Sequence, residues 1–186
     1  MKKKGLALVL ALALLVIGVV GGTLAWLTST SDEVVNTFTT SDITVTLEET
    51  KNDFQMIPGY TIDKDPVITV KANSEKCFLF VKLEKSANFD DYLTYEMVTG
   101  WTALPGVDGV YYRIVDKTDA DTVFHVLKDD QVSVKGEVTK AMMETAKTSK
   151  PTLTITAFAC QYMQDNDTPF DVAEAWAKVA PATTNP

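Results

Sequence analysis

The sequence predicts a mainly β protein: an antiparallel, jelly-roll-like β-sandwich with one or two short helices and a C-terminal helix, preceded by an N-terminal signal helix. Two observations favour this class. About eight short runs rich in β-branched and aromatic residues lie between residues 43 and 162. Turn signals separate these runs at roughly 8 to 12 residue intervals, which is typical of a sandwich or barrel and not of alternating β/α units.

Residues 1–25 have the order of a secretory signal peptide. Three lysines precede an uninterrupted apolar run, residues 6–20, which small residues follow. Thr23 and Ala25 stand at the two positions that a signal peptidase reads, so we expect cleavage between Ala25 and Trp26. The protein is therefore expected to be secreted and to act outside the cytoplasm.

The alternative is that the same segment stays in the membrane as an uncleaved anchor. The apolar run is shorter than the ~20 residues that a spanning helix needs, although counting on to Leu27 reaches about that length. Gly21 and Gly22 weaken a continuing helix, which favours cleavage.

The first expected strand, residues 43–47, alternates strictly between apolar residues and threonines. The run 77–84 begins apolar on both faces, as expected for a central strand buried on both sides at one end. Short connections predict two hairpins, one joining 67–72 to 77–84 and one joining 122–127 to 131–138. The other expected strands are residues 94–98, 110–115 and 152–162.

Short helices are expected at residues 88–93 and 140–147, and a stronger helix signal lies near the C-terminus. Thr168 is the expected N-cap of that last helix, with Pro169 at its first position and Asp171 at the capping-box position. Its expected apolar stripe consists of Phe170, Ala173, Trp176 and Ala177.

The expected organisation has four parts. They are a signal peptide (1–25), an extended N-terminal segment (26–42), one sandwich domain (43–180) and an unstructured tail (181–186). The net charge is −8, and losing the three export lysines would make it more negative by three. So acidic a chain repels phosphate backbones and anionic lipids, which argues against nucleic-acid binding.

Cys77 opens one apolar run and Cys160 closes another. Antiparallel pairing of those two strands would bring the cysteines near each other, and an exported chain allows a disulfide to persist. Two separately buried thiols are the alternative, because free cysteine packs well as a small apolar residue.

The sequence contains no catalytic motif. His125 is the only histidine and lies in an apolar strand run, so we expect it at the rim of the core or partly in it, and not in a metal or triad site. The protein is therefore not expected to be an enzyme, and no cofactor is expected, calcium apart. Two pairs of carboxylates could contribute to a calcium site, with turn chemistry as the alternative: Asp63 with Asp65, and Asp165 with Asp167.

Four aromatic residues could line a sugar-binding platform, although their positions in or beside strands favour core packing. They are Tyr92, Trp101, Tyr111 and Tyr112.

Several stretches resemble the TasA/camelysin family of Gram-positive secreted proteins. They are GGTLAWLTSTSDEVVNTFT around the expected cleavage site, KDPVITV at 64–70, SEKCFLFVK at 74–82, LTITAFA at 153–159 and FDVAEAW at 170–176. The resemblance implies processing by a SipW-type signal peptidase and a jelly-roll domain that polymerises into fibres of the biofilm matrix. Camelysin has also been described as a metalloprotease.

In that family's mode of assembly, each subunit accepts the N-terminal segment of its neighbour as an added strand. Residues 26–40 suit a donor because they are Thr-rich and only modestly apolar, and the expected donated contacts are Trp26, Leu27, Val34, Val35 and Phe38. Other matrix proteins would be further partners. The alternatives are a monomeric secreted or surface-anchored module that binds carbohydrate or a host surface, and a metallopeptidase.

Overall fold

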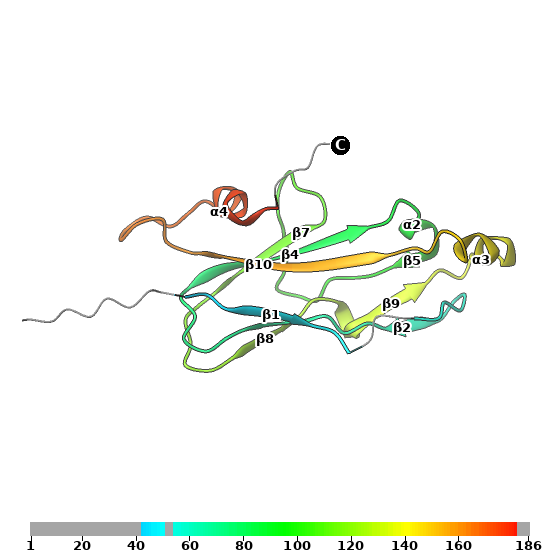
Figure 1. Cartoon of the computed structure of the whole chain (residues 1–186), viewed down its shortest axis with the longest axis horizontal. Helices are drawn as coiled ribbons and strands as arrows, with labels where there is room; N and C mark the ends of the chain where they lie inside the picture. The colour runs from blue at the N-terminus through cyan, green and yellow to red at the C-terminus, as the bar shows by residue number, and fades with distance from the viewer. Residues whose placement is uncertain (1–41, 51–53, 182–186) are drawn as a thin grey trace, which may run out of the picture. The chain divides into compact units, whose positions relative to one another are not determined.

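A computed structural model of the chain describes residues 42–50 and 54–181 (Figure 1). The expected signal peptide, the cleavage site and the donor contacts between Trp26 and Phe38 lie outside the described residues. The described part is mainly β, as predicted, with antiparallel sheets and a few short helices. None of the helices in this part is long and apolar enough to cross a membrane.

One layer is an antiparallel four-stranded sheet in the order β10-β4-β7-β6. Its central strand β4 (Cys77–Lys85) is buried on both faces over Cys77–Val81, as predicted for this run. Its neighbours are β10 (Leu153–Gln161), β7 (Val110–Val115) and, beyond β7, the short β6 (Thr102–Ala103).

The opposite layer consists of two three-stranded sheets, ordered β1-β3-β8 and β2-β9-β5. Backbone bonds from Val126 N–H to Pro66 O and from Lys64 N–H to Asp130 O continue the pairing from one sheet to the other. The two sheets therefore lie end to end, because β2 and β3 belong to one continuous segment and β8 and β9 to another. The strands are β1 (Val45–Glu48), β2 (Thr61–Asp63), β3 (Val67–Val70), β5 (Leu93–Thr94), β8 (Thr122–His125) and β9 (Gln131–Val134).

The interruption between the two sheets is the 3-10 turn η1 (Lys128–Asp130). Asp129 and Asp130 have positive φ there, which breaks the extended backbone between β8 and β9. The segment therefore changes sheets at this point without forming a hairpin.

The core lies on both faces of β4. Its odd-numbered residues from Cys77 to Leu83 pack between the layers with Ile68, Val126 and Leu127. Phe78 and Phe80 face the other way and pack with Trp176. Alternation along one strand thus supplies two hydrophobic clusters.

Three helices complete the described part: α2 (Phe89–Tyr92), α3 (Lys140–Ala146) and α4 (Val172–Val179). The first two confirm the expected short helices. α4 starts later than predicted, because the Asp171 side chain caps it by accepting from Ala173 N–H at 2.8 Å. Residues 168–170 are instead held in extended pairing, with Phe170 N–H donating to Tyr162 O.

The face of α4 that packs on the sheet also differs from the predicted stripe. Ala175 and Trp176 are buried and Val172 is half-buried, whereas Ala173 and Ala177 are exposed. Trp176 lies 5.3 Å, between ring centroids, from both Phe80 and Phe158. The apolar stripe that packs on the sheet is therefore Val172, Ala175 and Trp176.

Both predicted hairpins are wrong. β3 pairs with β1 and β8, whereas β4 pairs with β10 and β7, so the connection after β3 crosses between layers. The second hairpin is absent because β8 pairs with β3, whereas β9 pairs with β2 and β5. The short strands β2 and β6 had no sequence signal because each is only two or three residues long.

Candidate functional site

The edge strand β10 presents an unpaired row of backbone groups. Among the described residues, β10 pairs with β4 alone. Tyr162 N–H donates to Lys76 O and Ser86 N–H donates to Thr152 O, so the even-numbered residues of this segment face β4. The N–H and C=O groups of its odd-numbered residues therefore point away from the sheet: Leu153, Ile155, Ala157, Ala159 and Gln161.

β1 is the corresponding edge of the opposite layer. Lys71 N–H donates to Thr44 O, and the register continues as Val45 opposite Val70. The backbone groups of Val45 and Leu47 therefore face outward. β1 and β10 contact each other across the layers and run side by side in Figure 1. We call the two outward edges the β1/β10 seam.

The seam is apolar and only partly covered. The inward-facing side chains of β4, such as Leu79 and Val81, have no exposed surface. Those of the seam face the same core but stay half-buried; they are Ile43, Val45, Leu47, Leu153, Ile155, Ala157 and Ala159. An additional strand placed here would therefore bury apolar surface as well as complete a ladder.

β10 lacks the usual protection of an exposed edge. Natural proteins place lysines, prolines, bulges or very short strands where an edge must not pair. The nine residues of β10, LTITAFACQ, contain no charge and no proline, and all nine pair in continuous register with β4. The lack of charge and proline is visible in the sequence, but the position of the strand at an edge is not.

The structure does not gather the proposed calcium ligands into a metal site. Asp65 accepts from Thr50 N–H and its hydroxyl, while the exposed Asp63 ends β2. Asp165 accepts from the backbone N–H groups of Asp167 and Thr168, which is turn chemistry. In the part of the chain that the structure describes, no three His, Cys, Asp or Glu residues are placed to hold a metal ion.

The Asp167 and Thr168 bonds have an electrostatic consequence. The backbone N–H of Asp167, followed by the contacts with Thr168, holds the pKa of Asp165 below its ordinary value. Asp165 therefore stays ionised as the organiser of its own loop.

His125 lies at the rim, as predicted. It ends β8 with a side chain about half exposed, and its Nδ1 lies 2.9 Å from Asp130 Oδ1. Its backbone carbonyl accepts a hydrogen bond from Trp101 Nε1 at 2.9 Å. The imidazole thus contacts one carboxylate at the turn that follows β8.

The four aromatic residues do not share one platform. Tyr92 is buried, and its hydroxyl donates to Met142 O at 3.0 Å. Tyr111 packs against the cluster between the layers, whereas Tyr112 packs against the cluster under α4. Core packing therefore accounts for these three tyrosines.

Cys77 and Cys160 are free and buried. Their strands pair antiparallel, as expected, but Cys160 stands opposite Phe78, and Cys77 stands opposite Gln161. The one-residue offset places the two side chains in different hydrophobic clusters. Of the two alternatives, a disulfide and two separately buried thiols, the structure has the second.

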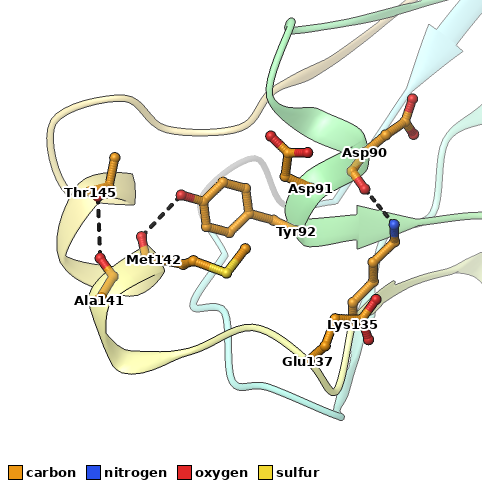
Figure 2. Close-up of a pocket in the computed structure, with 8 residues that line it drawn as sticks. All are labelled: Asp90, Asp91, Tyr92, Lys135, Glu137, Ala141, Met142 and Thr145. Atoms are coloured by element: carbon orange, nitrogen blue, oxygen red, sulfur yellow. Dashed lines mark hydrogen bonds between the residues drawn. The ribbon is translucent and has the colours of Figure 1, made fainter.

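A shallow hollow of about 520 Å³ lies between α2, α3 and the turn after β9. Figure 2 shows Tyr92 pointing across it to α3, and Lys135 Nζ pointing to the backbone oxygen of Asp90. The Tyr92 bond joins α2 to α3, and the Lys135 bond joins the turn after β9 to α2. The hollow is therefore explained by packing of the end of the sandwich.

A scan of protein-family models, curated proteins and solved structures finds no match to this chain. The geometry of the described residues therefore carries the functional argument. The β1/β10 seam is the strongest feature of that geometry, because it combines unpaired backbone with half-exposed apolar side chains.

Proposed function

We propose that this protein is a secreted structural subunit of extracellular fibres in the biofilm matrix or on the cell surface. Each subunit donates its N-terminal segment, residues 26–42, to the β10 edge of a neighbour. The observation that carries the proposal is the long, uncharged edge of β10, which pairs with no strand other than β4 among the described residues. Main-chain hydrogen bonds would supply affinity, and the half-buried seam side chains would supply pockets.

The proposed architecture is a jelly roll that the donated strand completes. The two described layers support it: one is a four-stranded antiparallel sheet, and the other consists of two three-stranded sheets that backbone bonds link into one layer. A donor that enters between β10 and β1 would close the sandwich on the side where its core is least covered.

Filaments follow from the head-to-tail character of this contact. The donor segment and the acceptor edge are different surfaces, so each added subunit leaves one free donor and one free acceptor. A SipW-type signal peptidase would free Trp26 during export, and cleavage after Ala25 would license assembly. The protein is proposed to have no enzymatic activity and no cofactor.

The first experiment deletes the donor. The protein lacking residues 26–38 is expected to keep its circular dichroism spectrum and to form no filaments in negative-stain micrographs. Filaments formed by this variant would exclude donation of the N-terminal strand.

The second experiment blocks the acceptor with a matched pair of prolines. Ala157→Pro removes an N–H that points away from β4, where an edge strand tolerates proline, so the variant is expected to fold but not to assemble. Thr156→Pro is the control, because its N–H belongs to the ladder with Lys82, and we expect it to destabilise the domain.

The two experiments separate the parts of the proposal. If the Ala157→Pro variant forms normal filaments and the deletion variant forms none, the acceptor lies outside the β10 edge. A wild-type protein that stays monomeric at all concentrations would instead support a binding module, with its own N-terminal segment covering β10.

A further inference from the structure

Arg113 is the only arginine in the chain, and the fold places it against two aromatic rings. It lies on β7 opposite Leu79 of β4. Its Cζ is 4.1 Å from the ring centroid of Phe124 on β8 and 5.2 Å from that of Trp101, which precedes β6. Three segments from both layers thus converge on one guanidinium, at a place separate from the β1/β10 seam.

Among the described residues, this guanidinium has no acceptor. It makes no hydrogen bond or ion pair with any residue in 42–50 or 54–181, although it carries five N–H donors. Eight described lysines do have carboxylate partners: Lys64, Lys71, Lys76, Lys82, Lys85, Lys117, Lys128 and Lys147. In a chain with 25 acidic and 17 basic residues, an unpaired arginine is conspicuous.

The unpaired donors reach solvent. Thr46 Oγ1 is the one fully buried side-chain polar atom without a partner among the described residues. The nitrogens of Arg113, which is itself only partly buried, are therefore accessible. Burial nevertheless lowers the pKa of Arg113, so its charge is poorly hydrated and gains from a new partner.

Gly100 keeps the guanidinium in this position. Its φ is +101°, and a Cβ added there would lie 2.9 Å from Arg113 Nη2. A glycine thus allows the backbone to approach the charged group closely. The rings and this backbone limit the directions from which a ligand reaches the N–H groups.

We propose that Arg113, held by Trp101 and Phe124, is a binding site for a carboxylate carried by another molecule. A planar guanidinium matches the two oxygens of a carboxylate in a bidentate pair, and contact with aromatic rings fixes its plane. A singly charged carboxylate also suits an acidic protein better than a doubly charged phosphate or sulfate does. The carboxylate has two sources: an acidic side chain of a second copy, or a small free acid.

The test uses nuclear magnetic resonance of the ¹⁵N-labelled full chain. Because the chain has one arginine, its Nε–H gives a single, unambiguous signal. Propionate is titrated against sodium chloride and sodium sulfate at matched ionic strength. A saturable shift with propionate, weaker with sulfate and absent with chloride, is the expected result.

Variants are followed through the indole N–H signal of Trp101, which is assigned by its loss in Trp101→Phe. Arg113→Lys keeps the charge but loses the planar fork, and we expect propionate to bind about tenfold more weakly. Lys147→Gln removes one charge from an exposed pair and should leave the affinity unchanged.

The same signals distinguish the two sources. One outcome is a shift that appears without added acid and depends on protein concentration. If propionate reverses this shift and Arg113→Lys abolishes it, the carboxylate belongs to a second copy. A shift with propionate alone assigns it to a free acid. No saturable shift from either source, equal affinity for sulfate, or unchanged binding by a folded Arg113→Lys protein would overturn the proposal.

Discussion

Cys77 and Cys160 lie on neighbouring strands but face opposite sides of the four-stranded sheet. The strands pair so that each cysteine is one residue out of register with the other. Desolvation by burial, with a smaller contribution from Cys160, raises the pKa of Cys77 to about 11. Desolvation also raises the pKa of Cys160.

Both thiols should therefore be inert in the folded protein. At neutral pH the thiolate, which is the reactive form, is scarce in a group with so high a pKa. A chromogenic disulfide reagent should modify neither thiol in buffer and two thiols per chain in guanidinium without any reductant. The Cys160→Ala variant should give one modified thiol per chain in guanidinium. Fewer thiols before reduction than after it would reveal a disulfide.

The N-terminus of α4 offers a test of its cap. Asp171→Ala removes the side-chain acceptor of Ala173 N–H, and we expect it to lower the free energy of unfolding by about 1 kcal/mol. Asp171→Asn retains an acceptor and should stay near the wild type. Thr168→Ala should cost at most about 0.5 kcal/mol, because Thr168 lies before the helix. Urea denaturation measures all three variants. A larger loss of stability from Thr168→Ala than from Asp171→Ala would mean that Thr168 is the N-cap.

Glycines at turns should differ in their tolerance of alanine. Gly106 and Gly109 both have positive φ, but an added Cβ meets nothing at Gly106 and would lie 2.4 Å from Leu83 O at Gly109. We expect Gly106→Ala to cost about 1 kcal/mol and Gly109→Ala clearly more. Gly136→Ala, with open space and no positive φ, is the neutral control. Equal melting temperatures for the first two variants would contradict this close approach.

Asp121 should contribute stability that depends on pH. The backbone N–H of Ala72, followed by Lys71, holds the pKa of Asp121 below its ordinary value of 3.8. Because the folded pKa is depressed, the contribution is present above the unfolded pKa and is lost as pH falls through the folded pKa.

Asp121→Asn removes the charge and keeps an oxygen for Ala72 N–H. It should therefore be less stable than the wild type at neutral pH, and the difference should shrink as pH falls below about 4. Urea midpoints across this range measure the difference. A gap that is constant with pH would mean that the charge of Asp121 does not contribute.

Strand positions were largely predictable, because alternation and β-branched runs mark them locally. The predicted strand 110–115 has the same bounds as β7, and the predicted strand 152–162 contains the whole of β10. Pairing was not predictable in the same way. Six residues between β3 and β4 allow either a hairpin or a crossing between layers, and the choice depends on which faces the distant strands β10 and β8 cover.

The candidate site was predictable only in part. The donor segment is proposed from sequence alone, and the described residues include only its last residue, Asp42. The lack of charge along β10 is a property of the sequence, but its position at an edge is not. The same holds for Arg113, whose two aromatic neighbours come from segments on either side of it in the chain.

Local sequence patterns predict which residues are apolar, with what period, and where the longer strands and the short helices form, because these depend on neighbours along the chain. Long-range packing was needed to show that, within residues 42–50 and 54–181, β10 and β1 are edges and Arg113 has no hydrogen-bond or ion-pair partner, and that Cys77 and Cys160 face apart. Layer order and register follow from long-range packing, in which a shift of one residue reverses every side chain.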